Sequence, residues 1–137
     1  DAKIAAAGLP HLHPLALDLL TDPPPAERYD LIYTLMTLHH VADAGRLLRI
    51  FHDLLRPGGW LGIADLDRED GSFHGPGFTG HNGFDRDALW AQLAEAGFSR
   101  VELCTAYVLK KATDQGPREY PLFLAVAARP IVKGGIG

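Results

Sequence analysis

The chain has 137 residues, of which 47% are hydrophobic and 22% charged, and its formal net charge is -4 at pH 7. This composition is typical of one globular domain with a substantial core. The acidic balance excludes sequence-independent binding to nucleic acid, because no excess of basic side chains is present to neutralise phosphates, and no apolar run approaches the roughly 20 residues of a membrane-spanning helix.

The N-terminal part is expected to hold the end of a helix and then two strands. An Ala-rich start followed by Gly8 predicts a helix end whose earlier turns precede the chain. Residues 9–17 carry leucines and two prolines, which predicts a strand at a sheet edge, since proline removes a ladder donor. A proline-rich loop over 21–28 leads into an apolar run over 30–35, which predicts a strand buried on both faces.

The middle of the chain predicts a helix, a buried strand and a long loop. Asp43 is a good N-cap, because apolar residues recur after it at helical spacing as far as Leu55. The Pro57-Gly58-Gly59 turn ends this helix, and residues 60–66 form the second buried strand. The glycine-rich segment over 67–84 is long for a connection in a compact domain, which is typical of a functional lid.

The C-terminal part predicts one more helix and a hairpin. Asp85 caps a helix that ends at Gly97. Residues 100–109 alternate as a strand, 110–119 form a polar turn, and 122–128 form the last strand, antiparallel to the one before it.

This order of elements predicts a single α/β domain over residues 1–137, because strands alternate with helices as in parallel sheets. The sheet is expected to be mostly parallel, with an antiparallel hairpin at its C-terminal end. We find no internal repeat and no domain boundary.

Four motifs in this order resemble the class I S-adenosylmethionine-dependent methyltransferases. They are Tyr29-Asp30-Leu31-Ile32 running into Leu38-His39-His40-Val41, the turn Leu54-Leu55-Arg56-Pro57-Gly58-Gly59, the helix from Gly83-Phe84-Asp85 to Glu95-Ala96-Gly97-Phe98, and the closing antiparallel pair. The resemblance implies a Rossmann-like methyltransferase sheet and methyl transfer from S-adenosylmethionine to a small-molecule acceptor.

The chain departs from the family at its N-terminal end. The family's glycine-rich first loop and the acid that holds the cofactor ribose have no counterpart before Asp18. The resemblance therefore implies an N-terminally truncated, partial domain that is not expected to act alone. Two alternatives stay open: a non-catalytic remnant that acts in oligomerisation or partner binding, and a nucleotide-binding oxidoreductase of related fold, which the missing glycine fingerprint and the C-terminal hairpin disfavour.

The resemblance also assigns cofactor-binding residues. Asp18 and Leu19 stand where the family's acid accepts a hydrogen bond from the adenine amino group, and a carboxylate suits that role because it only accepts. Thr34, Leu35 and Met36 would lie along the methionine portion of the cofactor. The alternative for Leu35 is ordinary strand core.

Four histidines are expected at the acceptor: His39, His40, His74 and His81. Methyl transfer mainly requires alignment of the acceptor, and a hydroxyl or protonated amine also needs a base, for which histidine is suited near neutral pH. The alternative for His39 and His40 is that one packs under the helix that starts at Asp43 while the other forms a hydrogen bond to a loop. The sequence identifies no catalytic residue.

Neither metal chemistry nor thiol chemistry is predicted. His11 and His13 would point to one face of a strand, but local spacing fixes no set of three ligands, so we predict no metal site. Cys104, the only cysteine, is expected to be a buried and inert thiol. Because it cannot form an internal disulfide, and the chain opens without a signal peptide, a cytoplasmic protein is expected.

The truncation predicts an uncovered sheet edge. In the family, two strands separate the third strand, here residues 12–17, from the fourth, here residues 31–35. Without those two strands the fourth strand has a free side, and exposed edges recruit partners. We therefore expect self-association, or relocation of the first strand against the fourth.

Overall fold

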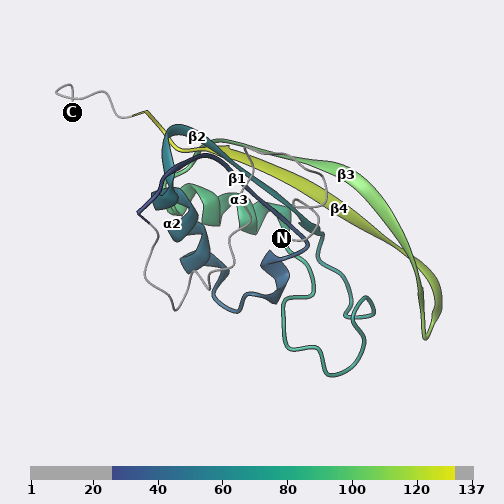
Figure 1. Cartoon of the computed structure of the whole chain (residues 1–137). Helices are drawn as coiled ribbons and strands as arrows, with labels where there is room; N and C mark the ends of the chain where they lie inside the picture. The colour runs from purple at the N-terminus through teal and green to yellow at the C-terminus, as the bar shows by residue number, and fades with distance from the viewer. Residues whose placement is uncertain (1–25, 132–137) are drawn as a thin grey trace, which may run out of the picture.

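Four strands of the computed structural model, which describes residues 26–131, form one sheet in the order β1-β2-β4-β3 (Figure 1). β1 (Tyr29–Leu35) runs parallel to β2 (Leu55–Leu66), β2 runs antiparallel to β4 (Gly116–Ala128), and β4 pairs antiparallel with β3 (Ser99–Thr113). The α/β class and the C-terminal antiparallel hairpin are confirmed. The expected helix end and strand within the first 17 residues lie outside the described residues.

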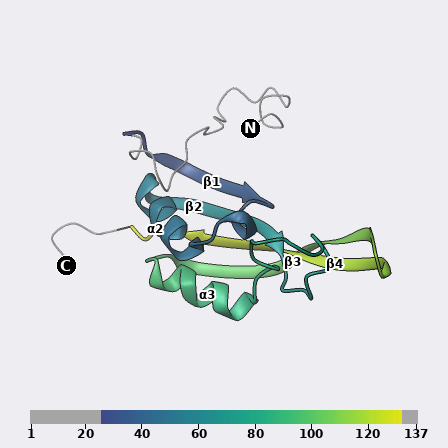
Figure 2. The same ribbon diagram turned by 90° about the horizontal axis from the view of Figure 1, so that it is seen from below.

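Both long helices pack on the same face of the sheet, which Figure 2 shows from the helix side. α2 (Ala44–Leu54) and α3 (Arg86–Glu95) begin where expected, because Asp43 and Asp85 accept hydrogen bonds from backbone N–H groups three residues later, at 3.0 and 2.9 Å. α3 ends at Glu95, and Gly97 just beyond it takes a φ of 103°, which lets the chain turn back on itself. Within residues 26–131, no helix is long and apolar enough to cross a membrane.

The hydrophobic core lies between these helices and the sheet. Alternate residues of the two central strands point toward the helices, because side chains alternate across a strand. Those of β2 and β4 that line the core, each at most 1% exposed, are Leu55, Leu61, Ile63, Phe123, Ala125 and Ala127.

The opposite face of the sheet is open. Leu31, Tyr33 and Leu35 of β1 are 55%, 46% and 50% exposed, so the prediction of a strand buried on both faces is wrong for β1. Cys104 of β3 is also exposed, so the predicted buried thiol is wrong. The reason is common to both: among the described elements, only the other face of the sheet is covered by helices.

β1 lies at the edge of the sheet. Among residues 26–131 its only pairing partner is β2, and the expected uncovered side of β1 stays a prediction. The expected relocation of the first strand concerns residues that are not described, and self-association remains a prediction.

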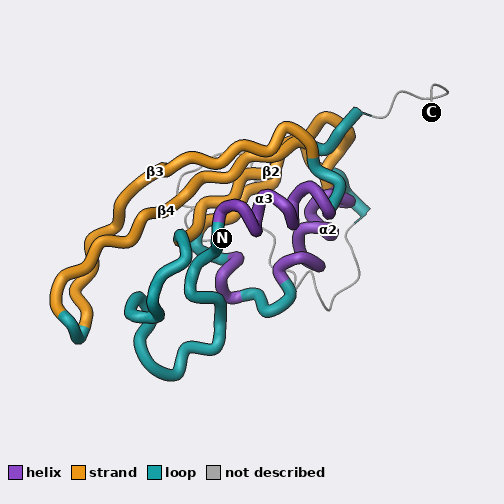
Figure 3. The backbone as a smooth tube through the Cα atoms, turned by 180° about the vertical axis from the view of Figure 1, so that it is seen from behind, coloured by secondary structure: helices purple, strands orange, loops and turns teal. Residues whose placement is uncertain are grey.

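The C-terminal hairpin is longer than predicted. The polar segment 110–119 was expected to be a turn, but β3 continues to Thr113 and β4 begins at Gly116, which leaves two residues for the turn. Polar composition does not prevent pairing where water reaches both faces, and oppositely charged residues such as Lys110 and Glu119 stand across from each other. Figure 3 shows this hairpin reaching beyond the helices, beside the long loop.

β2, the strand that precedes this hairpin in the sequence among the long strands, also starts earlier than predicted. β2 begins at Leu55 rather than residue 60, because Leu55 already pairs with Tyr29, and the Pro-Gly-Gly segment forms an irregularity before the next pair, Leu31 with Trp60. Gly58 takes a φ of 86° there, and its N–H donates to the carbonyl of Arg129 at 2.8 Å.

Candidate functional site

The candidate site lies where the parallel strands β1 and β2 end. Parallel strands bring their carboxyl ends to the same edge of a sheet, and open α/β sheets bind ligands there. After β1 the chain turns sharply: Met36 has a φ of 53°, which is uncommon for a residue other than glycine and marks a strained position. Its N–H donates to the carbonyl of Ala64 at 2.8 Å, and a short 3-10 helix, η1 (Leu38–His40), follows.

The expected cofactor residues lie at this edge only in part. Thr34 is partly buried, and its hydroxyl oxygen is buried with no hydrogen-bond partner among the described residues. Leu35 is half exposed on the open face of the sheet. Asp18 and Leu19 lie outside residues 26–131.

A buried histidine–aspartate pair joins the two strand ends. His39 Nδ1 lies 2.6 Å from Asp65 Oδ1, and the side chains are 1% and 0% exposed. The same carboxylate accepts the N–H of His39 at 3.1 Å and that of Leu66 at 2.8 Å. An ionised carboxylate only accepts hydrogen bonds, so it places the imidazole proton on Nδ1 and leaves a lone pair on Nε2.

Three of the four predicted acceptor histidines meet beside this pair. One ring nitrogen each of His39, His40 and His74 lies within 4.8 Å of the other two. His81 is directed elsewhere: its Nε2 lies 2.9 Å from the carbonyl of Val41, while its N–H donates to the carbonyl of His39 at 2.8 Å. The long loop 67–84 therefore brings His74 to the cluster and uses His81 as a structural tie.

The ring of His74 is held by aromatic neighbours. Phe78 stacks on it with ring centroids 3.8 Å apart, and Phe73 meets it edge-on at 4.9 Å. Burial, and then the nearby His39 and His40, lower the pKa of His74 below its usual value. His74 is therefore held in its neutral form near pH 7.

The long hairpin holds the loop that carries His74. Lys111 of β3 lies over the ring of Phe73, 4.0 Å from its centroid, and donates a hydrogen bond to the carbonyl of the same residue. Ser72 and Tyr120 share a hydrogen bond of 2.6 Å between their hydroxyl groups. The extension of β3 and β4 beyond the core thus acts as a support for the site.

Asp65 was not predicted as a site residue. A carboxylate within the last residues of an otherwise apolar buried strand was the available signal. Its partner could not be identified from the sequence, because 26 residues separate Asp65 from His39.

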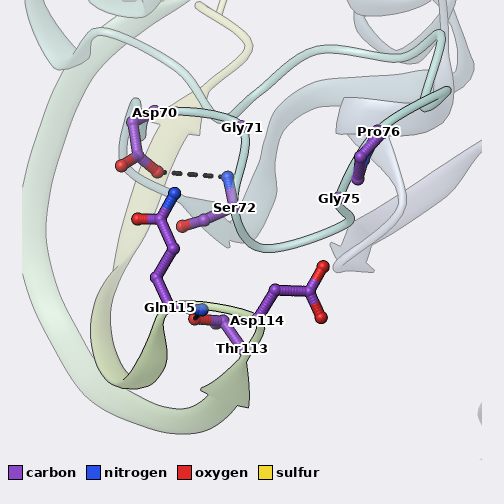
Figure 4. A pocket seen from close by; sticks show the side chains of 8 residues that line it. All are labelled: Asp70, Gly71, Ser72, Gly75, Pro76, Thr113, Asp114 and Gln115. Carbon is purple, nitrogen blue, oxygen red and sulfur yellow. Dashed lines mark hydrogen bonds between the residues drawn. The ribbon is translucent and has the colours of Figure 1, made fainter.

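Two hollows in the described surface lie away from the buried pair. The larger, about 380 Å³, opens between the loop and the hairpin turn; its lining residues are Asp70, Gly71, Ser72, Gly75, Pro76, Thr113, Asp114 and Gln115 (Figure 4). Hydrogen bonds from Ser72, and then Arg118, lower the pKa of Asp70 to about 2. The other hollow, about 290 Å³, lies by the starts of α2 and α3 and includes His81.

Comparison with known proteins gives a consistent result. A family model described as a methyltransferase domain matches residues 10–103. A protein from Bacillus halodurans described as a methyltransferase has a similar structure, with a TM-score of 0.66, 14% identity, and coverage of 94% of this chain and 76% of that chain. The S-adenosylmethionine-dependent methyltransferase SibL gives a TM-score of 0.60 at 25% identity, with 94% of this chain and 39% of that chain covered.

A third similar structure contains a bound cofactor. It is phosphoethanolamine N-methyltransferase 2 from Haemonchus contortus in complex with S-adenosyl-L-methionine, with a TM-score of 0.54, 12% identity, and coverage of 74% of this chain and 33% of that chain. The chain thus spans 76%, 39% and 33% of the lengths of these three proteins.

Proposed function

The chain belongs to the methyltransferase domain family, and on that premise we propose that it serves S-adenosylmethionine-dependent methyl transfer to a small-molecule acceptor. The relative from Haemonchus contortus that binds S-adenosyl-L-methionine supports the choice of cofactor. The acceptor is proposed to be small because the net charge of -4 offers no attraction to nucleic acid. Because the chain spans only part of its relatives, elements beyond it are proposed to complete the site.

The cofactor is proposed to lie along the end of β1. Met36 takes a φ of 53° just after β1, and the buried Thr34 hydroxyl has no hydrogen-bond partner among the described residues. Both observations fit a polar ligand at this edge. The roles of Leu35, and of Asp18 and Leu19 toward the adenine, rest on the family resemblance. When bound, the cofactor supplies a methyl group on a sulfonium sulfur.

The observation that carries the acceptor side is the His39–Asp65 pair. With the proton of its ring on Nδ1, His39 has a lone pair on Nε2 that can take a proton from an acceptor hydroxyl or ammonium group. Asp65 stabilises the imidazolium that forms and keeps the ring in place. The rings of His40 and His74 lie beside that of His39, with centroids 4.1 and 5.0 Å away, so an acceptor at His39 would also contact them.

Calorimetric titration with S-adenosylmethionine tests the proposal. We expect binding by a chain extended upstream that is weakened in a Thr34→Val variant, which removes only the hydroxyl. Thr113→Val at the hairpin turn is the matched control and should bind normally. Failure of both the 137-residue chain and the extended chain to bind would refute the proposal.

A non-catalytic role in oligomerisation or partner binding is the second candidate. Its support is the sheet face opposite the helices, on which Leu31, Tyr33, Leu35 and Trp60 are between 39% and 55% exposed, beside an edge of β1 that pairs with no other strand within residues 26–131. Contiguous exposed apolar residues are typical of protein-binding surfaces. Self-association without cofactor binding would favour this candidate.

A further inference from the structure

Three histidine rings converge at the carboxyl ends of β1 and β2. His39 and His40 come from η1, and His74 comes from the loop 67–84. The ring centroids lie 4.1 Å apart for His39–His40, 5.0 Å for His39–His74 and 5.6 Å for His40–His74. Three neutral imidazoles are a ligand set that suits divalent transition metals.

His39 has the surroundings of a metal ligand. Metal-binding histidines almost always donate their other ring N–H to a carboxylate, a carbonyl or water, and His39 Nδ1 meets the buried Asp65 carboxylate at 2.6 Å. Its side chain is only 1% exposed, and its Nε2 is buried without a hydrogen-bond partner within the described part of the chain. A lone pair that is buried, oriented and unpartnered points to a ligand.

His74 shares one of these features, a buried ring nitrogen without a hydrogen-bond partner in the described part of the chain. Its Nε2 is also buried and lacks a partner among residues 26–131. The stacked ring of Phe78, with centroids 3.8 Å apart, holds the imidazole of His74 in this position. His40 is the exposed member and gives an ion access from water.

We propose that His39, His40 and His74 bind one divalent transition-metal ion, with Zn²⁺ as the best fit. Three histidines leave a fourth position for water or a substrate atom, as in open zinc sites. Tetrahedral coordination places ligand nitrogens about 3.4 Å apart, whereas the present separations extend to 4.8 Å. Binding therefore draws His74, and the loop that carries it, toward the strand ends.

Metal binding and proton transfer compete for the same atom. The ion occupies Nε2 of His39, which the proposed function uses as the proton acceptor. This consequence rests on the proposed function, but metal binding itself does not. A bound ion would therefore inhibit a reaction that needs this base, and a chelator would restore it.

The binding experiment uses untagged protein treated with a chelator, without S-adenosylmethionine. Co²⁺ is titrated with detection by its visible absorption spectrum, and Zn²⁺ by calorimetry, near pH 7. We expect one ion per chain with a four-coordinate Co²⁺ spectrum. His40→Gln and His74→Gln should each weaken binding at least tenfold, and circular dichroism without metal checks that both variants remain folded.

Two control variants separate this site from the other histidines. His52→Gln on α2 should bind as the unchanged chain does, and so should the double variant His11→Gln/His13→Gln. Lack of one-to-one binding, full retention of binding by His74→Gln, or its loss in the His11/His13 variant would each overturn the proposal. Because the cofactor is not present, none of these results depends on methyl transfer.

Discussion

The substitution Asp65→Asn tests the contribution of the buried His39–Asp65 pair most directly. The carboxylate of Asp65 accepts three hydrogen bonds: from His39 Nδ1 at 2.6 Å, from the backbone N–H of His39 at 3.1 Å, and from that of Leu66 at 2.8 Å. An asparagine amide has one oxygen and one NH₂ group, so in either orientation the NH₂ group faces a backbone N–H. One buried donor must lose its acceptor.

The size of the effect follows from this geometry. A buried donor left without an acceptor costs about 1–3 kcal/mol, and hydrogen bonds to a charged group contribute about 1.5–3 kcal/mol. With Asp65 fully buried, we expect Asp65→Asn to lower the free energy of unfolding by about 3 kcal/mol. If the NH₂ group faces the ring, the imidazole proton moves to Nε2, and His39 can then neither accept a proton nor bind a metal there.

Urea denaturation measures this change, and the chain contains a matched control. His52 Nδ1 and Asp53 Oδ1 form a similar pair at 3.2 Å, but Asp53 is 78% exposed. Asp53→Asn should change the free energy of unfolding by less than about 0.5 kcal/mol, because water replaces the lost interaction. At an unchanged denaturant slope, a loss of unfolding free energy in Asp65→Asn no larger than that in Asp53→Asn would contradict this expectation.

The remaining predictions concern pH, a helix end and the sheet edge. Because folding lowers the pKa of His74, the unfolded chain binds a proton at this residue more readily than the folded chain, and stability is lost as the pH falls below the ordinary histidine pKa of 6.5. In urea denaturation at a series of pH values, His74→Gln should reduce this loss of stability. Gly97→Ala places a Cβ at a φ of 103° and 2.9 Å from Nε2 of His52, which should lower the free energy of unfolding by about 1–2 kcal/mol. Gly45→Ala within α2 should instead raise the free energy of unfolding by about 0.5–1 kcal/mol. Leu31→Lys on the open face should reduce self-association measured by sedimentation velocity, and Trp90→Lys on α3 should not; equal effects of the two would contradict a role for the sheet face.

Local sequence signals determined most of the elements. The capping carboxylates of Asp43 and Asp85 fix both helix starts, and Gly97 fixes a helix end, because these features depend on residues within a few positions along the chain. The apolar runs likewise predicted β1 and the second half of β2. The four ordered motifs identified the family that the match over residues 10–103 then supported.

The tertiary structure decided what depends on contacts between distant segments. The sequence predicted four histidines at the methyl acceptor, but only the path of the loop brings His74 to His39 and directs the ring of His81 toward Val41 instead. The pairing of β3 with β4 beyond the core depends on cross-strand partners, which polar composition does not reveal. The exposure of Leu31 and Cys104 depends on which face of the sheet the helices cover.

The buried His39–Asp65 pair marks the division between the two. The sequence by itself determined that His39 follows one apolar strand and that Asp65 stands near the end of another, because hydrophobic patterning and turn residues are local. Parallel pairing of β1 with β2 brought the two strand ends together and removed both side chains from water. Only that long-range packing fixes the imidazole proton on Nδ1 and so leaves the lone pair, on which both proposals rest, on Nε2.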